Sequence, residues 1–469
     1  MKGPFFMKRI ISIVFAAVCA AVLFTGCYRP ESAAASSFSV INSATDETAA
    51  SFITDSTTVP SETDAPLVGT TTVVSRTKKI SAATTAKKKP VTTKQADKPT
   101  TPTRLKRAGG HYMDAYILMD TGDVYRWDFD TLQKNADGQK MGTLLKRHSG
   151  MKDYRLVTMT NCQPMEMLLD TAGNLFVCGR VPSRTETVSL TSNDYNDFAP
   201  SHTREQVSPQ KIAEGVKSIV EGAYLTNSGD VYLYGIAYGS STGKSFAQPQ
   251  KIMNGVDSLC GNLHRLFAIT TAGDLLAIGD LEGGNWEAPL KLASQAACIT
   301  IVDETISYVS RSGDFFILDK PQDGSTSYRP RKISAQVKQG IASRNSYVYL
   351  TLNNTLYASF SGEPAVKIAT RVKDFTLAGA LLYRDQENHL YGSGVNMNCL
   401  RGIEGDPGRE SSNRILSGTQ TYSVTDLCAY AMDAEGNWYT WGANSIGLRT
   451  SDGHLQLDIA TPLLLPAIQ

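Results

Sequence analysis

The sequence predicts an all-β fold: a β-propeller of seven or eight four-stranded blades, preceded by a signal peptide and a disordered linker. Three observations lead to this prediction. A hairpin turn recurs eight times at intervals of 34 to 56 residues, a proline–lysine element precedes five of the hairpins, and the first hundred residues differ in composition from the rest. Periods of this size are typical of arrays in which each repeat is one supersecondary unit.

The hairpin has its clearest form at Asp433-Ala-Glu-Gly436-Asn, between a strand that contains Cys428 and a strand that runs through Trp441. Glycine suits the turn because this position requires φ > 0, which glycine adopts without steric cost. Asparagine, which takes the place twice, tolerates the left-handed region better than other side chains do. The eight predicted turn residues are Gly122, Gly173, Gly229, Gly273, Gly313, Asn354, Asn388 and Gly436.

The proline–lysine element predicts the outer strand of each blade. Proline cannot donate to a ladder and is therefore confined to strand starts and sheet edges, and lysine commonly protects an exposed edge. An outer strand, a connecting strand and the hairpin make four short strands per period, which is the content of a propeller blade. The copies are Pro209-Gln-Lys-Ile212, Pro249-Gln-Lys-Ile252, Pro289-Leu-Lys-Leu292, Pro330-Arg-Lys-Ile333 and Pro364-Ala-Val-Lys-Ile368.

The chain ends predict how the ring closes. Thr461-Pro-Leu-Leu-Leu-Pro466 repeats the outer-strand element without a following hairpin, while Pro102-Thr-Arg-Leu105 stands 20 residues before Gly122. We expect residues 463–465 to join the sheet of the first hairpin, residues 116–127, because the leucine run would otherwise be an exposed apolar tail.

The repeats resemble the regulator of chromosome condensation family, which includes alpha-tubulin suppressor-like propellers. The resemblance depends on the Gly-Asp/Asn turns and on Trp441-Gly442-Ala-Asn444-Ser-Ile-Gly447-Leu448, with a weaker echo at Tyr391-Gly392-Ser-Gly394-Val-Asn396, and covers residues 103–469. The family usually has seven blades, whereas eight hairpins are present here. The resemblance implies a propeller fold for residues 103–469.

The N-terminus predicts a lipoprotein signal peptide over residues 1–26. Lys8 and Arg9 precede an apolar run from Ile10 to Phe24, which is too short to span a bilayer comfortably and suits a signal-peptide core. The following Leu23-Phe-Thr-Gly-Cys27 resembles the lipobox of bacterial lipoproteins, in which the cysteine is diacylated and becomes the mature N-terminus. An ordinary secretory signal and an uncleaved anchor are the alternatives. The sequence thus predicts an exported protein, anchored in the cell membrane through lipid on Cys27 and facing outside.

Residues 27–102 form the predicted linker. Ser, Thr, Ala, Pro and Lys dominate it, and such a segment cannot bury enough apolar surface to offset its ordering entropy. Residues 28–75 carry −5, whereas residues 76–107 carry +10. The basic half indicates contact with anionic wall polymers or lipid headgroups, or else a solvated spacer that reaches about 50 Å.

Charge argues against a nucleic-acid partner. The whole chain carries +1, and residues 1–27 carry +3; with the two linker values above, this leaves −7 for residues 108–469. Nucleic-acid binding normally requires a basic face. We therefore do not transfer the chromatin and GTPase roles of the family's nuclear members.

The sequence contains no motif for catalysis, a cofactor or a metal. Its six histidines lack metal-site spacing, and Gly239-Ser-Ser-Thr-Gly243-Lys244-Ser245 is one residue short of a phosphate loop. The six cysteines after residue 103 allow fifteen disulfide pairings or serve as small buried core residues. They are Cys162, Cys178, Cys260, Cys298, Cys399 and Cys428.

Two function classes remain. We favour a module that binds an extracellular protein or a cell-wall glycan, because propeller loops are rigidly presented and commonly carry recognition. A propeller enzyme, a lyase or hydrolase acting on polysaccharide, is the alternative. The insertion at residues 182–208 contains Tyr195 and Phe198, and the loop at residues 280–287 contains Trp286. Aromatic residues in such loops anchor interfaces or stack on sugars, so these three are the predicted binding residues; capping of the propeller core is the other interpretation.

Overall fold

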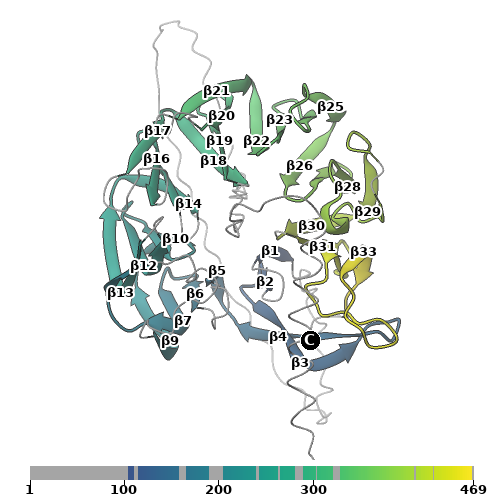
Figure 1. Cartoon of the computed structure of the whole chain (residues 1–469), viewed down its shortest axis with the longest axis horizontal. Coiled ribbons are helices and arrows are strands. Elements are labelled where there is room, and N and C mark those ends of the chain that lie inside the picture. Colours follow the sequence, from purple (N-terminus) through teal and green to yellow (C-terminus); the bar gives the residue numbers. More distant parts are fainter. Residues whose placement is uncertain are drawn as a thin grey trace, which may run out of the picture. The chain divides into compact units, whose positions relative to one another are not determined.

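The computed structural model shows an eight-bladed β-propeller of four-stranded antiparallel sheets, one of which gains a fifth strand (Figure 1). The structure describes residues 104–109, 115–157, 165–189, 204–238, 242–261, 265–279, 289–302, 304–320, 328–405, 408–425 and 427–466. The predicted signal peptide, Cys27 and the linker lie outside these residues. No helix within the described ranges has the length and apolarity needed to cross a bilayer.

Blades are numbered here in chain order, and the first four contain seventeen strands. They are β1 (Leu105–Gly109), β2 (Tyr116–Met119), β3 (Val124–Lys134) and β4 (Lys140–His148) in blade 1; β5 (Met151–Val157), β6 (Met165–Asp170), β7 (Leu175–Pro182) and β9 (Arg204–Ala213) in blade 2; β10 (Val216–Val220), β11 (Ala223–Thr226), β12 (Val231–Tyr238), β13 (Thr242–Met253) and the added β8 (Glu186–Ser189) in blade 3; and β14 (Val256–Gly261), β15 (Arg265–Thr270), β16 (Leu275–Gly279) and β17 (Leu290–Ala293) in blade 4.

The other four blades contain sixteen strands. They are β18 (Ala296–Val302), β19 (Thr305–Ser310), β20 (Phe315–Asp319) and β21 (Arg329–Ser334) in blade 5; β22 (Val337–Ser343), β23 (Ser346–Thr351), β24 (Leu356–Ser359) and β25 (Val366–Ala369) in blade 6; β26 (Val372–Leu377), β27 (Leu381–Asp385), β28 (Leu390–Ser393) and β29 (Asn413–Leu416) in blade 7, with the 3-10 turn η1 (Met397–Cys399); and β30 (Thr419–Val424), β31 (Cys428–Asp433), β32 (Trp438–Ala443) and β33 (Asp458–Leu464) in blade 8.

Each blade is a meander that begins with its inner strand and ends with its outer strand, so the first strands of the blades surround the centre of the ring (Figure 1). All five proline–lysine elements lie in or lead into outer strands, as predicted. Their lysines also make ion pairs across the sheet. Lys251 Nζ lies 2.8 Å from Asp230 Oδ1, and Lys332 Nζ lies 2.9 Å from Asp314 Oδ1. The aspartates belong to the hairpin turns, so one ion pair joins the two recurring sequence elements.

The predicted turn residues lie at the second-to-third strand connections, and all eight have positive φ. Their backbone also joins one blade to the next. The carbonyl of Gly122 accepts a 2.9 Å hydrogen bond from the N–H of Met151, and Gly229 accepts one of 3.0 Å from Val256. The same contact recurs at the Gly173, Gly273, Gly313, Asn354 and Asn388 turns. A hairpin turn therefore also docks the first inner-strand residue of the following blade.

Aromatic pairs recur across the middle two strands of the blades. Tyr224 and Tyr232 are directly opposite in β11 and β12, and their rings stack at a centroid distance of 5.0 Å. Cross-strand aromatic pairs of this kind stabilise a sheet beyond their buried area. Equivalent stacked pairs are Tyr308–Phe316, Tyr349–Tyr357 and Tyr383–Tyr391. The Tyr or Phe after these four turns is thus a packing residue of the blade.

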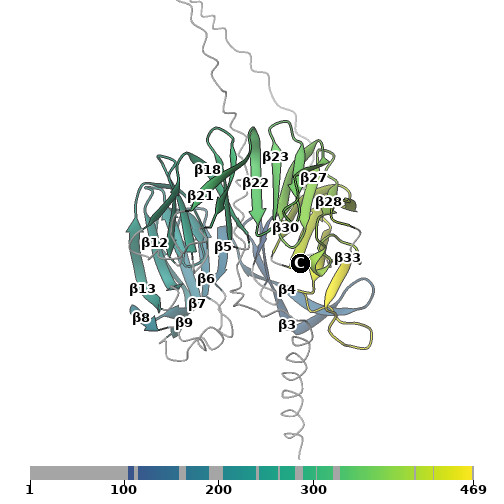
Figure 2. The ribbon, with the colours of Figure 1, turned by 45° about the horizontal axis from the view of Figure 1, so that its top comes forward.

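The insertion between β7 and β9 contains a strand that the sequence did not predict. β8 pairs antiparallel with the first residues of β13, so a segment of blade 2 extends the sheet of blade 3 (Figure 2). The Oγ of Ser245 donates a 2.9 Å hydrogen bond to the carbonyl of Arg184 beside this strand. The pairing covers part of the outer edge of blade 3.

The predicted closure of the ring is wrong. Leu463 and Leu464 pair with Thr440 and Tyr439 in blade 8, so β33 completes its own blade rather than the sheet of the first hairpin. Blade 1 already has four strands from its own segment, because Leu105 begins its inner strand and not an outer one. The leucine run is still covered in part, since Leu465 is buried.

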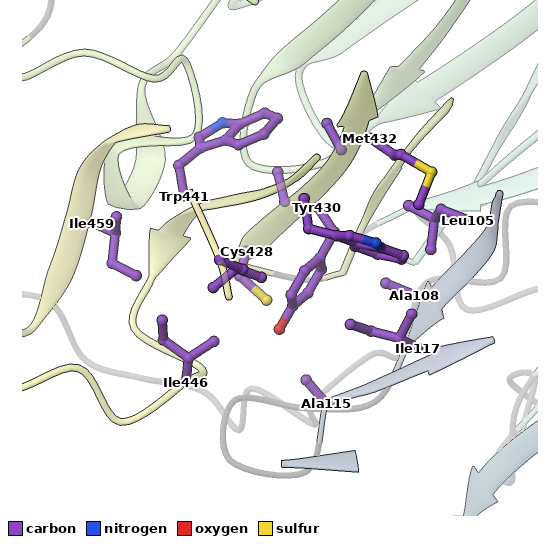
Figure 3. Close-up of a cluster of buried hydrophobic side chains, with 14 of the residues drawn as sticks. Leu105, Ala108, Ala115, Ile117, Cys428, Tyr430, Met432, Trp441, Ile446 and Ile459 are labelled. Carbon is purple, nitrogen blue, oxygen red and sulfur yellow. The ribbon is translucent and has the colours of Figure 1, made fainter. Parts of the chain in front are cut away.

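Side-chain packing and loop contacts join blade 8 to blade 1. The largest buried cluster among the described residues spans the two blades and extends into blade 7. Figure 3 shows its blade 1 members Leu105 and Ile117 beside Tyr430 and Met432 of blade 8. Ser423 Oγ accepts from the N–H of Ala108 at 2.9 Å.

Loops outside this cluster also cross the junction. The N–H of Gly142 in β4 donates to the carbonyl of Ile446 at 2.8 Å, and Arg449 N–H donates to the carbonyl of Lys140 at the same distance. The loop after β32 of blade 8 therefore binds the long β3–β4 hairpin of blade 1 through main-chain hydrogen bonds.

Candidate functional site

Every inner strand begins with the same β-bulge. In β1, Leu105 and Arg107 pair with the adjacent residues Met119 and Leu118, which leaves Lys106 as the extra residue. The register shifts in the same way at the start of the other seven inner strands. A bulge directs an extra side chain out of the ladder. The eight bulge residues are Lys106, Lys152, Lys217, Asp257, Ala297, Lys338, Lys373 and Gln420.

Five of these eight residues are lysines, and all five are exposed. Because each stands at the start of an inner strand, the five lysine positions belong to one end of the ring centre. We call this set, Lys106, Lys152, Lys217, Lys338 and Lys373, the lysine rim. With Asp257 as the one acidic residue at the eight positions, the bulge residues carry a formal charge of +4.

Three rim lysines point from one blade to the next. Lys106 Nζ donates to the carbonyl of Lys152 at 2.6 Å, and Lys152 Nζ donates to the carbonyl of Lys217 at 3.0 Å. Lys217 Nζ donates to the carbonyl of Asp257 at 2.7 Å and lies 3.2 Å from its Oδ1. A lysine ammonium has three donors, so these contacts position the cations and leave donors for a ligand.

Three of the nearby hairpin-turn carboxylates are paired with outer-strand lysines. Asp230, Asp274 and Asp314 each have a lowered pKa, and the largest cause is a hydrogen bond from the outer-strand lysine of the same blade. Exposed pairs of this kind contribute little to stability, while Asp170 and Asp433 in other hairpin turns are held by asparagine side chains and not by a lysine.

Two arginines follow the rim lysines on the inner strands β1 and β5. Arg107 of β1 pairs with Asp153 of β5 at 2.5 Å, and Arg155 Nε donates to the carbonyl of Ile219 at 3.2 Å. Burial alone would raise the pKa of Asp153, but the charges of Arg107 and then Arg155 hold this pKa below its ordinary value. These ionic contacts cross the junctions of blades 1, 2 and 3, so the inner strands that carry the rim are joined side chain to side chain.

The predicted binding residues Tyr195, Phe198 and Trp286 lie outside the described residues. The strands that flank them show which face their loops leave. Both loops connect the third strand of a blade to its outer strand, after β8 in blade 2 and after β16 in blade 4. In an antiparallel meander this connection lies at the opposite end from the bulges and hairpin turns. The strand ends that flank these loops therefore lie at the opposite face from the lysine rim.

The rim lysines follow a recurring sequence pattern that the prediction of binding residues did not include. An apolar residue and then lysine recur 18 to 43 residues after four of the hairpin turns, in Met151-Lys, Val216-Lys, Val337-Lys and Val372-Lys. Alternation alone treats such a lysine as an ordinary outward residue of a strand. Only the bulge, which is a property of pairing, shows that these positions are equivalent.

Buried and exposed cysteines both occur among the described residues. Cys178, Cys260 and Cys428 are buried and form no disulfide with the described residues, as expected of core residues, whereas Cys298 is exposed. Burial raises the pKa of Cys260 to about 12. Cys399 is also unpaired, and Cys162 lies outside the described residues.

Comparison with known proteins gives the fold only. No protein-family model matches the sequence, and no curated protein matches it. Among solved structures, the chain is similar to human WBSCR16, with 13% identity and a TM-score of 0.40 over 63% of this chain and 94% of that one. It is also similar to yeast RCC1 (Prp20) solved with Kap60, with 15% identity and a TM-score of 0.41 over 62% and 85%. BamB from Moraxella catarrhalis has 11% identity and a TM-score of 0.37 over 72% and 98%.

Proposed function

We propose that this chain is an exported lipoprotein whose propeller is a binding module for an anionic polymer of the cell wall. The lysine rim is the observation that carries the proposal. Five cations at equivalent positions of a rigid ring match a ligand that repeats its negative charge, such as a chain of phosphate or carboxylate groups. A single small anion would need only one or two of them.

The N-terminal sequence supports the location. Residues 1–26 resemble a lipoprotein signal, and Cys27 would receive the lipid that holds the protein at the membrane. The basic half of the linker, residues 76–102, would meet the same anionic material before the propeller does. Two basic segments separated by an acidic propeller surface would then contact one polymer.

The experiment compares two variants of equal charge. In the rim variant, Lys106, Lys152, Lys217, Lys338 and Lys373 all become Gln. In the control variant, five outer-strand lysines become Gln. These are Lys146, Lys211, Lys251, Lys291 and Lys332, which are exposed and ion-paired. Binding of the full chain to purified cell walls is then measured by sedimentation.

We expect the rim variant to bind walls at least tenfold more weakly, while the control variant binds within about twofold of the wild type. Wild-type binding should fall steeply between 50 and 500 mM salt, since exposed charges are screened over about 10 Å at 0.1 M. Removing the anionic polymers chemically from the walls should have the effect of the rim substitutions. Equal loss in both variants would reduce the proposal to non-specific charge attraction.

The loops that contain the predicted aromatic residues, 182–208 and 280–287, are tested in the same assay. Tyr195, Phe198 and Trp286 remain the predicted contacts of the opposite face, suited to a protein surface or to sugar rings. A triple alanine variant that loses wall binding, alongside a rim variant that keeps it, would transfer the binding site to that face. The enzyme alternative predicts instead that wall polysaccharide is shortened during incubation.

A further inference from the structure

A polar cluster lies inside the interface of blades 1 and 2. The surrounding residues are apolar and include Leu118, Val124 and Leu168. Blade 1 contributes Arg126 from β3 and His148 from the end of β4, and blade 2 contributes Glu166 from β6 and Cys178 from β7. Glu166 and Cys178 are direct cross-strand partners, so their side chains leave the sheet on one face. Four chemically active groups thus meet in a largely apolar interface.

The distances place three metal-ligand atoms together. The Nε2 of His148, a carboxylate oxygen of Glu166 and the Sγ of Cys178 all lie within 4.8 Å of one another. His148 Nε2 is 2.7 Å from Glu166 Oε2, and the side chains of these two residues are 19% and 15% exposed. Imidazole nitrogen, thiolate sulfur and carboxylate oxygen are the donors that Zn²⁺ takes in proteins.

The fourth neighbour is a buried hydroxyl with no partner. Tyr154 of β5 is fully buried, and its hydroxyl makes no hydrogen bond to the described residues. The Glu166 carboxylate interacts with this hydroxyl, although not with normal hydrogen-bond geometry. Buried hydroxyls are normally hydrogen-bonded, and a water bound in the cluster would give this one a well-aligned partner.

We propose that His148, Glu166 and Cys178 bind one Zn²⁺ between blades 1 and 2, with the fourth position open to water and facing the Tyr154 hydroxyl. Zinc sites with three protein ligands and one open position are well established in tetrahedral geometry. Ligand atoms on such an ion lie about 3.3 to 3.7 Å apart, so His148 and Glu166 would separate slightly. His148 ends a strand beside Gly150, where the chain turns, and can move.

Arg126 completes the arrangement as an outer partner. Its guanidinium donates a 3.1 Å hydrogen bond to Oε1 of Glu166, whereas His148 faces Oε2. The carboxylate therefore has one oxygen for the metal and one oriented by the arginine, as ligating carboxylates usually have. With a glutamate and a thiolate as ligands, the ion itself is neutralised, and Arg126 leaves one net positive charge.

The three ligands are far apart in sequence order and come from two blades. No spacing motif could have revealed them, because His148 and Glu166 are 18 residues apart on different sheets. A metal here would tie blade 1 to blade 2. It would therefore act on the stability of the ring near the N-terminal end of the propeller.

The test uses the full chain, reduced and then freed of metal with a chelator. Zn²⁺ titration against a competing chromophoric chelator should give one site per chain. Co²⁺ in its place should give a thiolate-to-metal charge-transfer band, and Zn²⁺ should raise the melting temperature. Cys178→Ser should abolish the band and the rise in melting temperature. Arg126→Gln should weaken Zn²⁺ binding by roughly 10- to 100-fold.

The controls are Cys298→Ser and His454→Gln, two exposed residues of other blades. Both should bind one Zn²⁺ as the wild type does and keep the Co²⁺ band. Wild-type protein that binds no Zn²⁺, or that binds Co²⁺ without a thiolate band, overturns the proposal without recourse to any variant. A Cys178→Ser variant that folds and binds Zn²⁺ with unchanged affinity overturns it as well.

Discussion

Gly122 meets two requirements that come from different parts of the chain. Its φ of +84° is the value that a hairpin turn demands, and this requirement is local. A Cβ at this position would also lie 2.7 Å from the N of Met151 and 2.9 Å from its O, which belong to the next blade. The turn glycine therefore allows blade 2 to approach blade 1 closely.

Gly436 separates the two requirements. It has nearly the same φ, +87°, but a Cβ there would meet nothing within 4 Å. We expect Gly436→Ala to cost about 1 kcal/mol through backbone strain alone, and Gly122→Ala to cost roughly 3 kcal/mol because the backbone of Met151 must also move. Urea unfolding of the full chain measures the difference. Equal costs at the two positions would show that blade docking does not depend on the glycine.

At the scale of single residues, the sequence was informative wherever the reason was local. The positive φ at Asn354 and Asn388 follows from the same turn rule as at the glycines. The equivalence of Lys106 and Lys338 could not be predicted, since it depends on a register shift between two strands. The contact between side chains of different blades, such as His148 and Glu166, could not be predicted from the sequence for the same reason.

The loop after β32 shows how one element closes the ring. Asn444 is fully buried, and its Nδ2 donates to the carbonyls of Leu448 and Gln456 at 2.8 and 2.6 Å. Its Oδ1 accepts from the N–H of Leu448 at 2.8 Å. One side chain thus holds the loop in the shape in which Ile446 accepts a bond from blade 1.

Asn396 provides a matched comparison in blade 7. It makes the same kind of contacts, to the carbonyls of Ile403 and Gly405 and from the N–H of Arg401, in a loop away from the blade 8–blade 1 junction. Each alanine variant removes three side-chain hydrogen bonds to the main chain and should cost about 1 to 3 kcal/mol. Only Asn444→Ala should also speed hydrogen exchange at Gly142.

Exchange at Gly142 is the decisive readout for that pair of variants. Its N–H donates to the carbonyl of Ile446, so protection at this one amide reports on the junction itself. If both variants expose Gly142 to the same degree, the loop has no special part in closure, and the buried cluster alone holds blade 8 to blade 1.

At the scale of elements, the sequence predicted strands and outer edges well and their partners poorly. The proline–lysine elements lie in or lead into outer strands because proline and edge position are linked locally. The closure prediction failed because it used the similarity of residues 461–466 to an outer strand without asking which hairpin they follow. They follow the Trp438–Ala443 strand directly, and pairing with it costs the least chain entropy.

The whole molecule divides its charge along the chain. Residues 76–107 carry +10, and residues 108–469 carry −7, yet the lysine rim concentrates positive charge at one end of the ring. Composition predicted the first two values, because they are sums. It could not predict the rim, which exists only once eight inner strands are arranged about one centre. An acidic protein can therefore have a basic face directed at its ligand.

Anchoring is a property of the whole chain and provides the last prediction. If Cys27 receives two acyl chains, the protein should sediment with membranes, because two chains give stable attachment where one gives only reversible binding. Cys27→Ser should move most of it to the soluble fraction without changing the melting temperature, since Cys27 is separate in sequence from the propeller. Cys19→Ser is the matched control, because Cys19 lies in the apolar core that would be removed with the signal peptide. Wild-type protein found wholly in the medium, with an N-terminus other than Cys27, would contradict the lipoprotein proposal and leave the lysine rim to be tested separately.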